Sequence, residues 1–477
     1  MVRSEMLING EWVGANGRAK FTVQSPATEE LVAELPMATE SDLENALQAA
    51  SKAFDEWKHS SGWQRNTLLK NIASRIRAKS EHIAKVLSSE EGKPFKEALA
   101  EVRSSADYFE WYGAQSLNIH SRLYKGHISG ETLLVEKNPV GPVAAFTAWN
   151  FPAVLPARKI AAALAAGCSV VLKPAEEAPL TAIALAEACV EAGLPRGLLN
   201  VVTGDPGFIS SYLISSDVIR KVSLTGSVRV GKLVMELCAK HLKPITLELG
   251  GHAPAIVLAD ADLTSAARVI TTGKFRNSGQ VCIAISKVYI ETLVKDSFLE
   301  HLLDQVGSLK PGWSNEDYDF GPLLNRARVD AMKKLVEDAV AKGAKVIMGG
   351  KEPTAQKGYW FEPTILIDVT KDADLFKDEP FGPILPIMTF DNVEEVVEHS
   401  NSSAYGLAGY IFGTDIDRCV EVGRKLQVGV VGINNVLVAT AEAPFGGVKN
   451  SGFGSEGGVE GLEEFLISKT YSILGGK

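Results

Sequence analysis

The fold is decided by residues 219–249, which read IRKVSLTGSVRVGKLVMELCAKHLKPITLEL. An apolar run at Ile219–Leu224 is followed by a segment of helical periodicity at 229–241 and by a second apolar run at Ile245–Leu249. Short apolar runs that alternate with amphipathic segments predict strands joined by crossover helices. Such units build a parallel, doubly wound sheet, so this stretch predicts an α/β fold that binds ligands beyond the carboxyl ends of its strands.

The same alternation continues on both sides of this stretch. Upstream, it predicts strands at 143–149, 169–172 and 199–202 and helices near 156–166, 179–192 and 208–215. Downstream, a second alternation from 254 to about 430 predicts strands at 254–258, 286–290 and 344–348 and helices near 262–274, 293–309 and 325–342. The sequence therefore predicts two α/β lobes, one after the other along the chain.

The rest of the chain follows other patterns. The first 35 residues are predicted to be extended. Ser41 and Glu44 form a capping box that predicts the start of a first helix, and two long amphipathic helices are expected near 64–90 and 95–118. Two further segments, 121–140 and 467–474, resemble strands outside both lobes. Exposed strands of this kind commonly pair with another subunit, so a homodimer or homotetramer is expected.

Composition and charge narrow the class of protein. With 477 residues, 45% hydrophobic and 22% charged, the chain is typical of a globular protein of about three domains or lobes. The net charge of −9 argues against partners such as nucleic acid or an anionic membrane. The five cysteines are odd in number and no CxxC occurs, which disfavours disulfides and a zinc site. No segment resembles a signal peptide or a membrane span, so we expect a cytoplasmic protein without a metal.

The sequence contains one candidate nucleophile, Cys282, in the segment FRNSGQVC. A cysteine in a polar, glycine-containing loop is reachable, whereas the other cysteines lie mostly in apolar helical contexts. Glu248 ends an expected strand between two leucines, where burial would raise the pKa of its carboxyl group and suit it to be a base. Spacing alone favours a surface glutamate on an edge strand.

Three segments are candidates for binding a phosphate or a ribose. Thr225-Gly226-Ser227 lies between an expected strand and helix, where a helix N-terminus binds anions, although a capped turn without a ligand fits as well. Lys173-Pro174-Ala175-Glu176 lies at another strand end and leaves the same two alternatives. Gly452–Gly457 matches GxGxxG but opens no crossover unit, so we expect a turn there.

Over essentially the whole chain these residues resemble the aldehyde dehydrogenase family. The resemblance rests on separate segments in the family's order, namely WNFP at 149–152, KPAE at 173–176, TGS at 225–227, LELGG at 247–251, GQVC at 279–282, EPFGP at 379–383 and PFGG at 444–447. It implies an NAD(P)-binding doubly wound parallel sheet, a second α/β catalytic lobe and a small β oligomerisation element. The implied ranges are 1–120 and 141–250 for the first, 251–435 for the second, 121–140 and 458–477 for the third, and 436–457 for a loop that returns to the active site.

The resemblance also implies the role of each site residue. Cys282 would be the nucleophile, Glu248 the general base, and the Asn150 amide with the Cys282 N–H the oxyanion hole. The residues that would bind the cofactor are Trp149, Lys173, Pro174, Glu176, Thr225, Gly226, Ser227, Leu249, Glu379 and Phe381. Because Glu248 would activate water, we expect neither a phosphorylating nor a CoA-acylating enzyme. The presence of all three catalytic groups also disfavours a non-catalytic structural relative.

Arg158 and Arg276 narrow the aldehyde substrate. An arginine pair at these positions resembles the succinate-semialdehyde dehydrogenase branch, where both would bind the far carboxylate. Structural ion pairs remain an alternative for each. Thr440 stands near the place where that branch has a serine, which leaves glutarate and 2-oxoglutarate semialdehydes open as substrates. Lactaldehyde or glycolaldehyde is a further alternative substrate. Glu176 favours NAD, because a carboxylate there repels the 2′-phosphate of NADP, and Lys173 leaves room for NADP.

Overall fold

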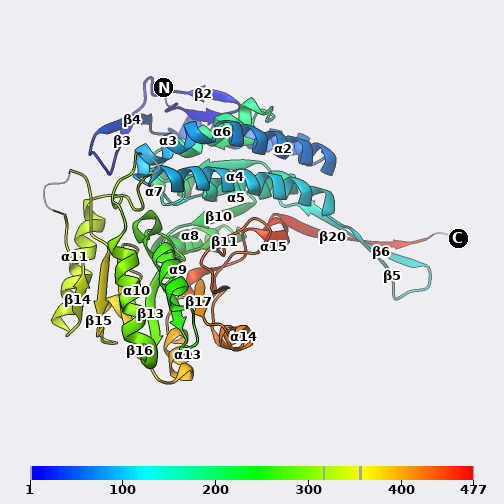
Figure 1. The fold of residues 1–477 in the computed structure, drawn as a ribbon. Coiled ribbons are helices and arrows are strands. Elements are labelled where there is room, and N and C mark those ends of the chain that lie inside the picture. Colours follow the sequence, from blue (N-terminus) through cyan, green and yellow to red (C-terminus); the bar gives the residue numbers. More distant parts are fainter. Residues whose placement is uncertain (1–2, 315–316, 354–356, 476–477) are drawn as a thin grey trace.

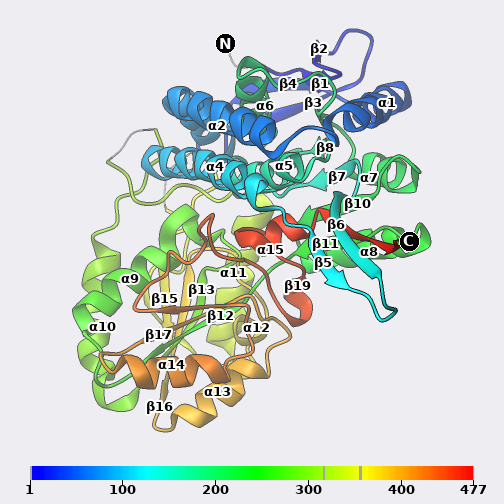
Figure 2. The same cartoon turned by 90° about the vertical axis from the view of Figure 1, so that its right-hand side faces the viewer.

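The computed structural model describes residues 3–314, 317–353 and 357–475 and has the expected α/β architecture. Two large, mostly parallel sheets each carry helices, and Figures 1 and 2 both show the first sheet with the N-terminal helices above the second sheet. A three-stranded antiparallel sheet projects from the body (Figure 1). Among the described residues, no helix combines the length and the apolar composition that crossing a bilayer requires.

The first sheet has the strand order β19-β11-β10-β7-β8-β9-β1-β2. Its parallel strands are β7 (Val143–Phe146), β8 (Val170–Lys173), β9 (Leu199–Val201), β10 (Lys221–Thr225) and β11 (Ile245–Glu248). Antiparallel strands close its edges, namely β1 (Met6–Ile8), β2 (Glu11–Val13) and β19 (Gly452–Phe453). The crossover helices are α5 (Val154–Ala166), α6 (Leu180–Glu191), α7 (Pro206–Ser215) and α8 (Val228–Lys240). Because helices cover both faces, the parallel strands are buried and consist of near-continuous apolar runs.

The second sheet has the order β14-β15-β16-β13-β12-β17-β18. Its strands are β12 (Ala253–Val257), β13 (Ile285–Glu291), β14 (Lys345–Met348), β15 (Thr364–Ile367), β16 (Ile384–Phe390), β17 (Ala408–Phe412) and β18 (Val430–Ile433), of which only β14 is antiparallel. Its helices are α9 (Leu263–Phe275), α10 (Lys295–Gly307), α11 (Arg326–Ala341), α12 (Asp374–Lys377), α13 (Val393–Asn401) and α14 (Ile416–Lys425).

The remaining elements lie at the top and along the projecting arm. The N-terminal helices are α1 (Glu40–Trp57), α2 (Gly62–Ala78), α3 (Ser80–Glu91) and α4 (Phe95–Gln115), preceded by a hairpin of β3 (Lys20–Gln24) and β4 (Leu31–Pro36). The arm consists of β5 (Arg122–Lys125), β6 (Glu131–Pro139) and β20 (Leu466–Leu474), and the short helix α15 (Gly458–Glu463) precedes β20. Single 3₁₀ turns are η1 (Ser116–Asn118), η2 (Arg276–Gly279), η3 (Thr292–Val294) and η4 (Lys449–Ser451).

Two sequence predictions about the N-terminal helices are wrong in detail. The capping box of α1 is formed by Thr39 and Asp42 rather than by Ser41 and Glu44, because Asp42 accepts from the Thr39 N–H at 2.9 Å and also binds Arg18. The helix expected over 64–90 is two helices that meet at Lys79. The apolar spacing continues through this break and therefore gave no sign of it.

The GxGxxG segment is the third difference. Gly452 and Phe453 form the edge strand β19 instead of a simple turn, with Gly452 opposite Glu248 of β11. A Cβ at Gly452 would lie 2.0 Å from the Leu247 carbonyl oxygen, so only glycine permits this approach. The segment therefore covers the strand that ends at Glu248.

Candidate active site

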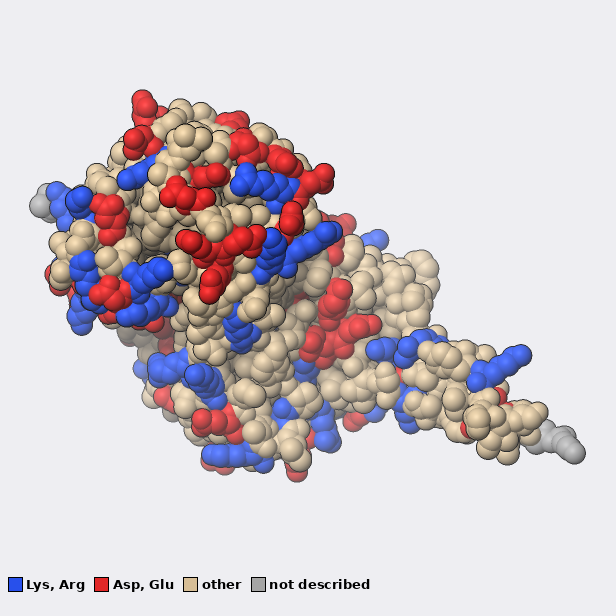
Figure 3. Space-filling model, turned by 90° about the horizontal axis from the view of Figure 1, so that it is seen from below, with Lys and Arg blue, Asp and Glu red and all other residues tan. Residues whose placement is uncertain are grey.

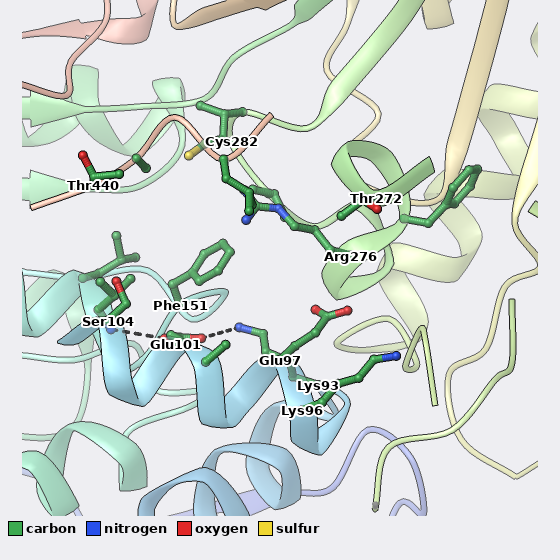
Figure 4. A pocket seen from close by; sticks show the side chains of 18 of the residues that line it. Lys93, Lys96, Glu97, Glu101, Ser104, Phe151, Thr272, Arg276, Cys282 and Thr440 are labelled. Atoms are coloured by element: carbon green, nitrogen blue, oxygen red, sulfur yellow. Dashed lines mark hydrogen bonds and ion pairs between the residues drawn. The ribbon is translucent and has the colours of Figure 1, made fainter. Parts of the chain in front are cut away.

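A cavity of about 720 Å³ contains four of the residues that the sequence singled out. Cys282, Arg276, Arg158 and Thr440 all line it, although they come from different parts of the chain. Figure 4 shows Cys282 and Arg276 on one side of the cavity, Phe151 and residues around the start of α4 on the other, and Thr440 toward one end. The structure thus brings the candidate nucleophile and both arginines to one space.

Cys282 differs from the other cysteines in accessibility. It is partly exposed at the wall of the cavity, whereas Cys168, Cys189, Cys238 and Cys419 are buried. Burial raises the pKa of the Cys282 thiol well above its ordinary value, and the nearby carboxylates Glu248 and Glu379 raise it further. The guanidinium groups of Arg158 and Arg276 act in the opposite direction. The thiol is therefore the form that predominates at neutral pH in this arrangement of charges.

Glu248 ends β11 as expected, and the alternative of a surface glutamate is wrong. The residue is 2% exposed, because β19 covers the edge of β11, and neither carboxylate oxygen has a hydrogen-bond partner. Burial, together with the neighbouring Glu456, raises the pKa of Glu248 to about 8. A carboxyl group with a pKa near the operating pH is suited to take up and release a proton.

Hydrogen bonds hold both the main-chain carbonyl group and the side chain of Asn150. Its carbonyl oxygen accepts from the Lys93 ammonium at 2.8 Å and from the Asn277 side-chain amide at 3.0 Å. Its own Nδ2 donates to the carbonyl oxygen of Gln280, two residues before Cys282, at 3.0 Å. A side-chain amide has two N–H groups, so one of them remains free to donate beside the cysteine.

The two arginines have different surroundings. Among the described residues, no carboxylate lies within 4.0 Å of the Arg276 guanidinium, which faces the Phe151 ring at 5.9 Å. Arg158 lies between the rings of Tyr108 and Phe445, at 4.9 and 4.8 Å, with one nitrogen 3.7 Å from Glu456. The structural ion pair that the sequence left open thus exists for Arg158 and not for Arg276. Thr440 lines the cavity as expected.

Sequence reasoning missed the charged residues around the start of α4. Lys93 and Glu101 form a buried ion pair at 2.6 Å, and Glu101 also accepts from the N–H groups of Ala153 and Val154 at the start of α5. Glu97 lines the cavity and accepts from the Asn277 N–H. The only available signal was the eight-residue spacing of Lys93 and Glu101, which is close to two helical turns.

The candidate diphosphate segment lies at the carboxyl end of β10. The Thr225 hydroxyl is buried without a hydrogen-bond partner, and Ser227 caps α8 by accepting from the Val230 N–H. The Gly226 N–H bonds to the Glu248 carbonyl oxygen and is therefore not free for a ligand. The free N–H groups of the first turn of α8 and the unpaired Thr225 hydroxyl fit a bound anion.

The other candidate cofactor residues form two further groups. At the carboxyl end of β8, before Pro174, the Lys173 ammonium binds the Glu176 carboxylate. Glu379 accepts from the Gly251 N–H at 3.1 Å, and burial raises the pKa of its carboxyl group to about 8. The Phe381 ring packs edge-to-face on Trp149 with centroids 5.6 Å apart. Leu249 lies beneath α8, where a Cβ at Gly231 would be 2.6 Å from its side chain. The side chains of both groups can bind a ribose or contact a ring of a ligand.

Comparison with known proteins gives one consistent result. Residues 12–471 match the sequence model described as the aldehyde dehydrogenase family. The chain is 39% identical over 476 residues to succinate-semialdehyde dehydrogenase (NADP+) GabD of Escherichia coli K12, covering 100% of this chain and 98% of that protein. It is 40% identical over 474 residues to glutarate-semialdehyde dehydrogenase of Pseudomonas putida, covering 99% and 98%. The crystal structure of an aldehyde dehydrogenase from Brucella melitensis biovar abortus 2308 superimposes with a TM-score of 0.97 at 39% identity, covering 100% and 98% of the two chains.

Proposed function

The chain belongs to the aldehyde dehydrogenase family, and from that membership we propose that it oxidises a short aldehyde with a carboxylate at its far end. It is an NAD(P)-dependent aldehyde dehydrogenase, and succinate semialdehyde is the substrate that we favour, with succinate as the product. The observation that carries the choice of substrate is Arg276. Its guanidinium lines the same cavity as Cys282 and has no carboxylate partner within 4.0 Å among the described residues.

A substrate carboxylate would supply the missing partner of Arg276. A guanidinium binds a carboxylate through two parallel hydrogen bonds, and such charged bonds contribute about 1.5–3 kcal/mol each. Arg158 already has an acidic neighbour, Glu456, and two aromatic rings, so we assign it to the wall of the site rather than to the main contact. We assign the Thr440 hydroxyl to the same carboxylate site, since Thr440 lines the cavity.

The chemical roles follow from the positions of three groups. After the Cys282 thiol has released its proton to water, its sulfur would form a bond to the aldehyde carbon, and the carbonyl oxygen would become an oxyanion. The free N–H of the Asn150 side chain and the Cys282 N–H would donate to that oxygen, each contributing about 3 kcal/mol to the transition state. Loss of hydride from the same carbon leaves a thioester on Cys282. Glu248 would then accept a proton from the water that hydrolyses this thioester, releasing the carboxylate product and the thiol.

The dinucleotide would supply the hydride acceptor of this reaction. We propose that Lys173, Pro174 and Glu176 bind its adenosine ribose, that residues 225–227 and Leu249 lie along its diphosphate, and that Trp149, Glu379 and Phe381 lie at its reactive end. Glu176 is accessible, with a side chain 41% exposed, and its carboxylate would repel a 2′-phosphate. We therefore propose NAD as the preferred cofactor, although the Escherichia coli relative is named for NADP+.

Glutarate semialdehyde is a second candidate substrate. The cavity of about 720 Å³ is large for a four-carbon aldehyde, and the Pseudomonas putida relative at 40% identity is named a glutarate-semialdehyde dehydrogenase. One additional methylene in an apolar pocket changes the free energy of binding by only about 1–3 kcal/mol. The enzyme would therefore prefer one of the two semialdehydes without excluding the other.

We also propose how the chain is divided and assembled. Residues 1–120 and 141–250 would form the cofactor-binding domain, 251–435 the catalytic domain, and 436–457 the loop that returns to the active site. The projecting arm would join subunits into a homodimer or homotetramer. Figure 3 shows the arm extending from the body with uncharged surface over much of its length, and Leu123, Ile467 and Leu474 are each at least half exposed on it.

The test of the proposed substrate compares Arg276→Ala with Arg268→Ala, an exposed arginine two turns earlier on α9. We expect Arg276→Ala to raise KM for succinate semialdehyde by about 10- to 100-fold, which corresponds to about one charged hydrogen bond. Oxidation of butanal, which has no carboxylate, should change by less than about threefold, and Arg268→Ala should change neither reaction. Equal losses of kcat/KM on both aldehydes would contradict the assignment of Arg276.

A further inference from the structure

The turn that leads to Cys282 has an unfavourable backbone conformation. Asn277, Ser278 and Gly279 follow one another in the left-handed region, with φ values of 46°, 53° and 73°. Residues other than glycine rarely adopt this conformation, and they keep it only where their surroundings hold them there. The protein must therefore stabilise this turn through specific contacts.

Hydrogen bonds from several side chains hold the turn. The Gln280 side chain accepts from the Leu324 N–H at 2.9 Å and donates to the Asn277 carbonyl oxygen at 3.2 Å. The Ser278 hydroxyl donates to the Gly321 carbonyl oxygen at 2.6 Å. At the start of the turn, the Asn277 N–H donates to the carboxylate of Glu97 at 2.8 Å. Glu97 thus holds the first residue of the strained segment.

Glu97 also lies beside the substrate cavity. It is in the first turn of α4 and lines the same cavity as Arg276 and Cys282. Figure 4 shows its carboxylate directed from α4 toward Arg276, on the same side of the cavity as Lys93 and Lys96. Arg276 immediately precedes the strained turn and Cys282 follows it by three residues. One carboxylate therefore fixes the short segment that carries both the candidate carboxylate-binding group and the nucleophile.

We propose that Glu97 is a positioning residue for aldehyde oxidation. By accepting from the Asn277 N–H it keeps the turn left-handed, and the turn keeps the Cys282 sulfur next to the Asn150 amide and the Arg276 guanidinium at the far end of the substrate. Glu97 acts through the backbone and contacts neither reacting atom. The inference rests on the proposed roles of Cys282 and Arg276.

Three substitutions of Glu97 separate the effect of side-chain length from the effect of its charge. Glu97→Gln keeps an oxygen that can accept from the Asn277 N–H but removes the charge. Glu97→Asp keeps the charge on a side chain that is one methylene shorter, and Glu97→Ala removes both. Glu110→Gln is the matched control, because Glu110 lies on the exposed side of the same helix, where it binds Arg77.

The experiment measures kcat and KM of the full-length enzyme with saturating NAD, on butanal and on succinate semialdehyde, together with the melting temperature of each variant. A displacement of about 1 Å in a catalytic group costs about 100-fold in rate. We expect kcat to fall at least about tenfold on both aldehydes in Glu97→Asp and Glu97→Ala, and less than about threefold in Glu97→Gln. Glu110→Gln should match the wild type.

Three results would overturn the inference. The first is a variant set in which only the melting temperature falls while kcat is kept, which is the result of a merely structural role. The second is a Glu97→Gln variant as slow as Glu97→Asp. The third is loss of activity on succinate semialdehyde alone. Because butanal reports the position of Cys282 without any carboxylate, the inference is tested even if the wild-type enzyme does not prefer succinate semialdehyde and the proposed substrate is wrong.

Discussion

The Lys93 ammonium lies 2.6 Å from the Glu101 carboxylate, and both side chains are buried beside the cavity, with exposed fractions of 1% and 3%. The pair holds two neighbouring elements. Lys93 donates to the Asn150 carbonyl oxygen, and Glu101 accepts from the first N–H groups of α5, the helix that carries Arg158. The position of Asn150, the proposed oxyanion donor, and that of Arg158 therefore depend on the same ion pair.

The ion pair of Lys93 and Glu101 predicts that substitutions of the two residues have strongly coupled effects on the free energy of unfolding. Removal of one partner of a buried ion pair leaves a buried charge without compensation and costs about 3–5 kcal/mol. We expect Lys93→Met and Glu101→Gln each to lower the free energy of unfolding by about that amount. The double substitution should cost less than the sum, since neither charge is then left alone. Urea unfolding of the four proteins gives the coupling energy, and additive losses would show that the two side chains act independently.

A second prediction concerns the thioester. If Glu248 activates the hydrolytic water, Glu248→Gln should complete hydride transfer once and then stop. We expect one NADH per active subunit, followed by a steady rate at least about 100-fold below that of the wild type. Mass spectrometry of the quenched protein should find the acyl group on the peptide that contains Cys282.

Two controls accompany this measurement. Glu248→Gln combined with Cys282→Ala should give neither the burst nor the adduct, whereas Glu248→Gln combined with Cys419→Ala should give both, because Cys419 is buried in α14. Rapid, continuous turnover by Glu248→Gln would assign the base to another residue.

The parallel strands of the first sheet and strands β12, β13 and β14 of the second follow from periodicity, because short apolar runs predict strands and the helices between them are amphipathic. Strands β15 to β18 and helices α12 to α14 lie in the range expected for the second lobe but were not predicted individually. The break between α2 and α3 does not follow from periodicity, because Lys79 departs from helical backbone angles, with φ −101° and ψ 7°, without interrupting the apolar spacing. Edge strand β19 was also missed. Its pairing depends on the approach of Gly452 to the Leu247 carbonyl oxygen, a contact between residues 205 positions apart that no local pattern reveals.

Some residues of the candidate site could likewise be predicted from the sequence, and others could not. Cys282 could be selected from its local context, a polar loop, whereas Glu248, at a strand end, was assigned as the base through the family resemblance. Their neighbours Lys93, Glu97 and Glu101 could not, since a run of charges before a helix normally faces water. Lys93 and Glu101 are buried and Glu97 is half-buried because the start of α4 packs against the loop before Cys282, where Glu97 accepts from the Asn277 N–H. That packing is a tertiary contact between segments about 180 residues apart.

A third prediction concerns the choice of cofactor. Glu176 binds Lys173 in the structure, and its carboxylate would lie where the 2′-phosphate of NADP approaches. We expect Glu176→Ala to raise kcat/KM for NADP by about tenfold and to lower that for NAD, because it removes the repulsion and frees the ammonium of Lys173. Initial rates with both dinucleotides at fixed aldehyde test this. Glu177→Ala, next to it, serves as the control, and unchanged NADP kinetics in Glu176→Ala would remove Glu176 from the adenosine site.

A fourth prediction concerns assembly through the arm. Strand β5 is fully exposed, with Leu123 at 71% and its outer edge unpaired among the described strands. We expect Leu123→Asp and Ile473→Asp to dissociate the oligomer, because a charge on an apolar contact must lose its water to be buried. Light scattering after size-exclusion chromatography measures the mass. Leu293→Asp, an exposed leucine outside the arm, is the control, and an unchanged mass in both arm variants would place the interface elsewhere.

The last prediction is a pH dependence of stability that arises at Glu248. Burial raises the pKa of this carboxyl group from 4.5 to about 8, so between these values the folded chain keeps a proton that the unfolded chain has released. The free energy of unfolding must then fall as pH rises from 4.5 to 8. Glu248→Gln removes this titration, while other buried carboxyl groups titrate equally in both proteins. We expect the variant to gain stability over the wild type steadily between pH 5 and 8, by urea unfolding. A constant difference across that range would mean that Glu248 titrates normally in the folded enzyme.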